Sequence, residues 1–189
     1  MEHVERAPGA LGRTAGLAVD AGAPTRVRSL VVAPLLLRWG LGAVFFVHGA
    51  QKLFGVFGGG GLAGTANGFA AMGLKPALFL AIAAALLEFG GSLLLAVGLL
   101  TRPVAALLAF EMLFALFAVH APNGFLLNWA CTPGKGQGIE YSLTLVVSLS
   151  ALALLGPGRA SLDGSRAVRQ KLRIPTVPQA RPRTRTPSP

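Results

Sequence analysis

The chain has 189 residues, of which 53% are hydrophobic and only 13% are charged, and this composition excludes an ordinary soluble domain. Its formal net charge of +10 comes mostly from basic residues in 1–28 and 159–189, on either side of the apolar part of the chain. Basic flanks beside apolar spans indicate the cytoplasmic side of a membrane protein and attraction to anionic lipid, rather than nucleic-acid binding.

The N-terminal segment, residues 1–28, mixes Gly, Ala, Pro and Arg without a sustained period, and we expect it to be disordered. It lacks the short apolar core and the small-residue cleavage site of a secretory signal. A first apolar span follows, from about Leu30 to Phe54, and its length is sufficient to cross a bilayer.

This first span contains three ionisable residues, Arg38, His48 and Lys52. On a helix with about 100° per residue, Lys52 lies about 40° and His48 about 80° around the axis from Arg38, so all three share one side. Ionisable groups within a span almost always face a polar interior, and we therefore expect this side to face other helices.

The next part of the chain, from Gly58 to Gly73, is rich in glycine and is predicted to be a loop. Span two runs from about Pro76 to Leu100 and contains one charge, Glu88. The short turn that follows predicts that spans two and three are antiparallel neighbours.

Span three, from about Pro103 to His120, contains Glu111. A loop follows that holds Cys131, and because this is the only cysteine it can form neither an intrachain disulfide nor a redox thiol pair. We expect it to be incidental. Span four runs from about Ile139 to Leu155.

The predicted fold is an all-α integral membrane four-helix bundle over residues 29–158, with both termini cytoplasmic. Residues 159–189 form a basic cytoplasmic tail, in which Ser161 or Asp163 could cap a short amphipathic helix before a disordered end.

An ion cluster is predicted from the depths of three residues within the spans. At 1.5 Å per residue, Arg38 and Glu111 lie about 12 Å and Glu88 about 18 Å from the cytoplasmic end. Two carboxylates around one arginine leave one negative charge uncompensated, which suggests a proton relay or a polar ligand site. The alternative is that Arg38 only pins the helices together.

A second polar group is predicted near the outer surface, from His48, Lys52, His120 and Glu140. His48 with Glu140 would suit proton transfer at the level of a quinone headgroup. His48 with His120 allows a two-histidine haem as a minor alternative, although both Glu111 and His120 can face the interior only if their helix kinks. No spacing predicts a metal site.

Six features in this order resemble the DoxX family of small bacterial membrane proteins: an arginine four residues before a glycine (Arg38 and Gly42), HGAQKLFG from His48, EFGGSLLLAVGLLTR from Glu88, a glutamate in span three (Glu111), IEYSL from Ile139 and GPGRASLD from Gly156. The resemblance implies a four-helix protein of the bacterial plasma membrane. It also implies kinship with the small subunit of thiosulfate:quinone oxidoreductase and, for some relatives, a complex with a sulfurtransferase or a superoxide dismutase.

Three functions follow from these observations. In the first, the protein is a quinone-interacting subunit of a membrane oxidoreductase complex, and its electrons come from a partner or from substrate. In the second, it is a non-catalytic membrane anchor or assembly partner whose basic tail recruits a cytoplasmic redox protein. A third function is a proton-coupled carrier, which would require an oligomer.

Overall fold

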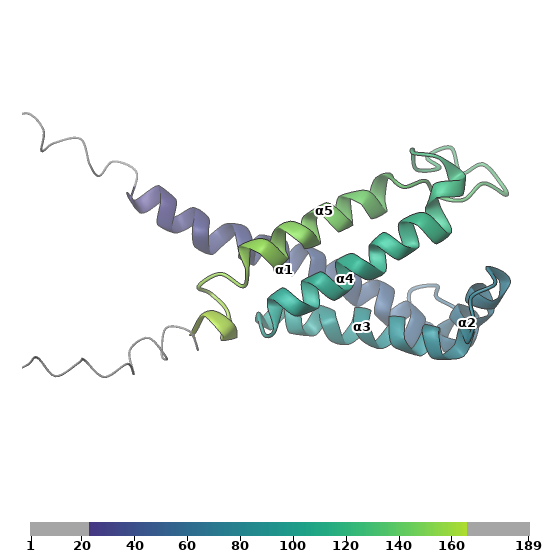
Figure 1. Ribbon diagram of the computed structural model, residues 1–189, viewed down its shortest axis with the longest axis horizontal. Coiled ribbons are helices and arrows are strands. Elements are labelled where there is room, and N and C mark those ends of the chain that lie inside the picture. Colours follow the sequence, from purple (N-terminus) through teal and green to yellow (C-terminus); the bar gives the residue numbers. More distant parts are fainter. Residues whose placement is uncertain (1–22, 166–189) are drawn as a thin grey trace, which may run out of the picture.

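Figure 1 shows the computed structural model, which describes the backbone of residues 23–165 and the side chains of residues 31–165. All of the regular elements in this range are helical, which confirms the predicted all-α class for the part described. They are α1 (Ala23–Phe54), α2 (Gly61–Ala71), α3 (Ala77–Val97), α4 (Thr101–Ala115), the π-helical turn η1 (Leu116–His120), the 3-10 turn η2 (Ala121–Asn123) and α5 (Glu140–Leu155). The expectations for residues 1–22 and 166–189 lie outside the described residues.

Three helical segments are long and apolar enough to cross a membrane: Val31–Phe54, Ala77–Val97 and Thr101–Asn123, with 24, 21 and 23 residues. Helix α5 is apolar but has only 16 residues, fewer than the roughly 20 that a perpendicular span needs. Membrane-spanning helices are therefore supported, while the count of four spans stays a prediction.

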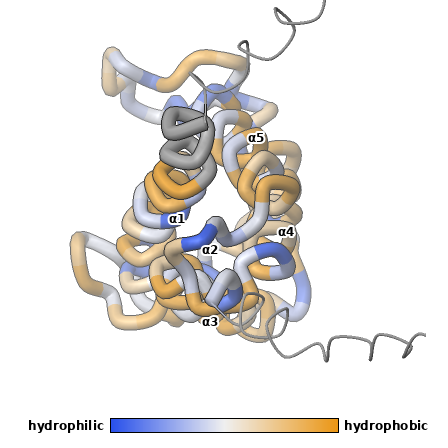
Figure 2. The backbone as a smooth tube through the Cα atoms, turned by 90° about the vertical axis from the view of Figure 1, so that its left-hand side faces the viewer, coloured by the Kyte–Doolittle hydropathy of each residue, from blue (hydrophilic) through white to orange (hydrophobic). Residues whose placement is uncertain are grey.

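The helices are arranged as two antiparallel pairs. Helix α1 packs mainly on α3, and α4 packs mainly on α5 (Figures 1 and 2). We call the end with the α3–α4 turn the tail end, and the end with α2 and the loop before α5 the loop end. Toward the loop end the α4/α5 pair diverges from the α1/α3 pair (Figure 1).

The buried apolar core joins all four long helices, but it lies mostly toward the tail end. On α4, for example, the core residues fall within the first eight positions of the helix. The core consists of Leu41, Phe45, Leu95, Val104, Ala105, Leu108, Leu145, Leu149 and Leu152. The loop-end halves of the two pairs are therefore held together by fewer buried apolar contacts.

Helices α1 and α3 approach closely at glycines. A Cβ on Gly42 would lie 3.3 Å from the Ser92 carbonyl oxygen, and a Cβ on Gly49 would overlap the Phe89 backbone. Small residues that let backbones approach are a common packing device between membrane helices. This contact sets the register in which Lys52 of α1 meets Glu88 of α3.

Replacing Gly49 with alanine is expected to lower the free energy of unfolding by roughly 1–3 kcal/mol, because the two backbones must separate. Gly40→Ala is the matched control, since a Cβ at Gly40 meets nothing within 4 Å. Unfolding in mixed detergent micelles measures both changes. Equal effects of the two substitutions would contradict this account of the α1–α3 contact.

Two predictions about the helices were wrong. Helix α1 begins at Ala23, inside the segment that was expected to be disordered. Residues Gly61–Ala71, expected to be loop, form α2, which packs on α3 and α1. Glycine lowers intrinsic helix propensity, but tertiary packing commonly overrides propensity, and here α2 lies against two longer helices.

Candidate functional site

The centre of the candidate site is an ion pair between α1 and α3. The Lys52 ammonium donates to both carboxylate oxygens of Glu88, with Nζ–O distances of 2.6 and 2.5 Å. The Glu88 side chain is 2% exposed and that of Lys52 is 25% exposed. Among the residues whose side chains are described, this is the only ion pair, and it lies within the apolar part of the bundle.

Arg38 lies elsewhere, at the tail end, and its guanidinium binds four backbone carbonyls. It donates to Leu95 and Ala96 in the last turn of α3, at 2.8 Å each. It also donates to Pro157 and Ala160 beyond α5, at 2.9 and 2.7 Å. The last carbonyls of a helix lack intrahelical partners, and a cation satisfies them well. Arg38 therefore fastens α1 to α3 and to the chain after α5.

The segment after α5 is fastened at further points. The Asp163 carboxylate accepts from the Thr101 N–H at 3.0 Å, and the Asp163 N–H donates to the Gly98 carbonyl at 3.0 Å. The Ser161 hydroxyl accepts from the Gly164 N–H, so Ser161 rather than Asp163 caps the helical turn that follows.

The absence of a side chain at Gly98 leaves room for the Arg38 guanidinium. Gly98 has a left-handed φ of 70°, and a Cβ there would lie 2.6 Å from Arg38 Cζ. The sequence pattern marked the segment GPGRASLD, from Gly156, but predicted no contacts for it. The contacts of this segment involve backbone atoms, which no residue pattern identifies.

The predicted cluster of Arg38, Glu88 and Glu111 is wrong in its geometry. Arg38 and Lys52 do share a side of α1, but they are fourteen positions apart, which is about 21 Å along the helix. Glu88 pairs with Lys52, and Arg38 turns to the carbonyls of the tail end. The alternative, that Arg38 pins the helices together, matches the observed contacts.

Glu111 and His48 lie beside the ion pair. The charges of Lys52 and Glu88 are close enough to act on both groups. The Oε2 atom of Glu111 is buried and has no hydrogen-bond partner among the described residues. His48 is exposed, so the expectation that all three ionisable residues of α1 face other helices does not hold for it. We call Lys52, Glu88, Glu111 and His48 the polar cluster.

The predicted outer group is not assembled as expected. A Glu140 oxygen accepts from the Leu127 N–H at 3.2 Å, and His120 Nδ1 lies 3.1 Å from the Gln137 carbonyl oxygen. Both side chains therefore organise the loop before α5. The π-helical turn ending at His120 supplies the helix irregularity that an inward His120 would require, but no contact of the described side chains joins His120 to His48.

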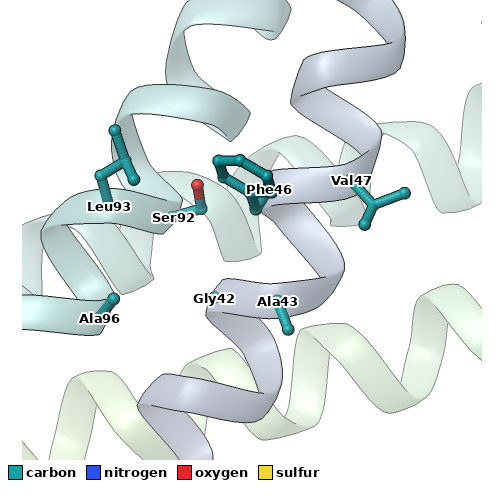
Figure 3. Close-up of a pocket in the computed structure, with 7 residues that line it drawn as sticks. All are labelled: Gly42, Ala43, Phe46, Val47, Ser92, Leu93 and Ala96. Carbon is teal, nitrogen blue, oxygen red and sulfur yellow. The ribbon is translucent and has the colours of Figure 1, made fainter. Parts of the chain in front are cut away.

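An apolar groove of about 290 Å³ runs along the other side of the α1–α3 contact (Figure 3). On α1 it is lined by Phe46, which lies about 120° around the helix from Lys52. Ser92, its one polar side chain, donates internally to the Phe89 carbonyl. The groove offers no ionisable group, and we place the candidate site at the polar cluster instead.

Comparison with known proteins gives two matches. Residues 33–121 match the model of the DoxX family, and this range contains all four residues of the polar cluster. The chain is also 32% identical over 136 residues to a protein of Bacillus subtilis (strain 168) named "Putative oxidoreductase CatD", covering 72% of this chain and 88% of that protein. No solved structure gave a significant match to the chain.

Proposed function

Because the chain belongs to the DoxX family of membrane proteins, we propose that it is a quinone-interacting subunit of a membrane oxidoreductase complex. The observation that carries this proposal is the polar cluster. Ionisable residues within membrane-spanning segments are rare and usually functional. Here a cation and a carboxylate form an ion pair, and a second carboxyl and a histidine lie close enough for the charges of that pair to act on them.

A quinone site needs an apolar slot and groups that exchange protons with the ring oxygens. Toward the tail end of the polar cluster, Phe45 and Leu108 are 1% and 0% exposed and belong to the core. The apolar core therefore begins one turn along the helices from His48 and Glu111. Reduction of a quinone takes up electrons and protons in equal number. We assign the proton contacts to the polar cluster, and the two electrons to a reduced substrate such as thiosulfate, delivered directly or through a partner protein. A protein of the sulfurtransferase or superoxide dismutase type is the candidate member of the complex.

We place the protein in the bacterial plasma membrane, with α5 as a fourth span and both termini cytoplasmic. The basic residues of 1–28 and 159–189 support this orientation, as does Arg102 at the tail end. The loop-end connections contain only Lys75 and Lys135 as basic residues between the helices.

The experiment is to purify the full chain in native-lipid discs, extract bound lipophilic molecules and measure quinone reduction with thiosulfate or another donor. The control is the double variant Lys52→Met with Glu88→Leu, which removes both charges together and so leaves neither one unpaired. We expect quinone to co-purify with the wild type and to fall by at least about tenfold in the double variant, which is the loss of one charged hydrogen bond.

A second function, that of an anchor for a cytoplasmic redox protein, is favoured by one observation. The segment leading to the basic tail is fastened to the bundle through Arg38 and Asp163. If the wild type holds no quinone and reduces none with any donor, the quinone proposal fails. Recovery of a partner that requires residues 166–189 but tolerates Glu88→Gln would then identify an anchor.

A further inference from the structure

The connection between α4 and α5, residues 124–139, is hydrogen-bonded back onto the start of α5. The Glu140 N–H donates to the Phe125 carbonyl at 2.9 Å. A Glu140 carboxylate oxygen accepts from the Leu127 N–H at 3.2 Å. Residues 125–127 are therefore held beside the first turn of α5.

Helix α5 is too short to cross a bilayer by itself. Its 16 residues give a length of about 24 Å, whereas the hydrocarbon core is about 30 Å thick. The antiparallel segment beside it, Thr101–Asn123, has 23 residues. The two segments are level at the tail end, where Arg102 donates to the Ala153 carbonyl at 3.3 Å. The missing length of α5 therefore falls at the loop end, where residues 125–127 lie.

Polar groups in this connection find partners within the connection itself. The Asn128 amide group donates to the carbonyls of Thr132 and Lys135 at 3.0 and 2.9 Å. Its side-chain oxygen accepts from the Thr132 N–H, and the Asn128 N–H donates to the Gln137 side chain. Non-helical backbone at membrane depth is tolerated only where its polar groups have partners other than lipid. These bonds reduce the number of groups that would need water.

The same connection exposes large apolar side chains. Phe125, Leu126 and Trp129 are 56%, 63% and 77% exposed. No Asp, Glu, Lys or Arg occurs in residues 121–134, and Lys135 is the first charged residue after α4. Exposed apolar groups that lie together without charges mark a surface that contacts a partner or a membrane.

Lipid is the partner that accounts for all of these observations. Helix α4 exposes Phe110, Phe114 and Phe117 at intervals of four and three residues, so one apolar side of α4 leads to the connection. This side of a membrane helix contacts acyl chains. A soluble protein bound to the connection would cover its apolar side chains but would leave the missing length of α5 unexplained.

We propose that residues 125–129 lie in the boundary between the lipid headgroups and the acyl chains, as an interfacial anchor that completes the span begun by α5. Lipid then covers Phe125 and Leu126, and Trp129 lies at the headgroup level, where tryptophan is enriched. Lys135 lies on the water side of this anchor. The inference rests on the proposed placement of α5 as a fourth span, and it does not involve quinone binding.

The test measures the depth of Trp129 in the full chain, reconstituted in phosphatidylcholine vesicles. The chain has two tryptophans, so Trp39→Phe leaves Trp129 as the only one. Lipids brominated near the headgroup should lower its emission at least about twofold, as expected for an indole at the membrane interface. Aqueous iodide should have little effect.

The matched control moves the indole along the same connection. The triple variant Trp39→Phe, Trp129→Phe and Lys135→Trp should be quenched by iodide and hardly by the brominated lipid. The ratio of lipid quenching to iodide quenching decides the result. A clearly higher ratio for Trp129 than for the Lys135→Trp reporter supports the anchor. Equal ratios, or quenching of Trp129 by neither agent, would overturn it.

Should Trp39→Phe fail to fold, Cys131 supplies a second measurement. It is exposed and is the only cysteine, so a bimane label can be attached without any substitution. A spin-labelled lipid should quench this label more than a water-soluble nitroxide does, and the reverse order contradicts the proposal. Neither measurement uses quinone, so the anchor and the quinone function can each fail while the other stands.

Discussion

Replacing Arg38 with alanine will lower the free energy of unfolding by roughly 4 kcal/mol or more, because several carbonyls lose a charged donor together. Arg38 is 2% exposed, and its guanidinium binds carbonyls from α3 and from the segment after α5. Membrane or soluble domains with stabilities of about 5–15 kcal/mol would lose much of their folded population through such a change. Unfolding in mixed micelles, and the yield of folded protein, measure the effect.

Arg38→Lys is expected to recover little of this stability. A lysine ammonium is a compact charge on a flexible stem, and it lacks the planar fork with which arginine reaches acceptors on two chain segments. The matched control is Arg102→Ala, which removes an exposed arginine with one 3.3 Å hydrogen bond to the Ala153 carbonyl. Similar losses in the Arg38 and Arg102 variants would contradict the role assigned to the tail-end contacts.

Removing one partner of the Lys52–Glu88 ion pair will destabilise the fold nearly as much as Arg38→Ala. Lys52→Met or Glu88→Leu alone is expected to lower the free energy of unfolding by roughly 3–5 kcal/mol, because an unpaired charge remains inside the bundle. The double variant removes both charges and should fall within about 1 kcal/mol of the wild type. The same micelle unfolding assay, applied to the wild type, the two single variants and the double variant, measures this double-mutant cycle.

Quinone binding should behave differently from stability in this cycle. If the pair contacts the ligand, the double variant regains stability without regaining quinone, and this pattern separates a functional pair from a structural one. A double variant that is both stable and fully able to bind quinone would show that Lys52 and Glu88 serve only to pack α1 against α3.

The sequence alone was sufficient for the class of protein and for the common side of α1 on which Arg38 and Lys52 lie. Long apolar runs are typical of membrane spans because the bilayer interior excludes unpaired polar groups, and the three longest matched helices in the structure. Helical periodicity placed Arg38 and Lys52 on one side of α1, and both do contact α3. The ordered motifs indicated the DoxX family, which the comparisons confirm.

Only the tertiary structure decided which groups meet. Periodicity specifies an angle around a helix axis, but not the axial register between helices, nor the end toward which a long side chain turns. Lys52 rather than Arg38 therefore pairs with Glu88. The register between α1 and α3 is set by the close contact of Gly49 with the Phe89 backbone. The partners of Arg38 are backbone carbonyls, which every residue carries and no pattern marks. Glu140 and His120 do not join the predicted outer site, because backbone atoms of the loop before α5 satisfy both side chains: Glu140 accepts from the Leu127 N–H, and His120 lies against the Gln137 carbonyl.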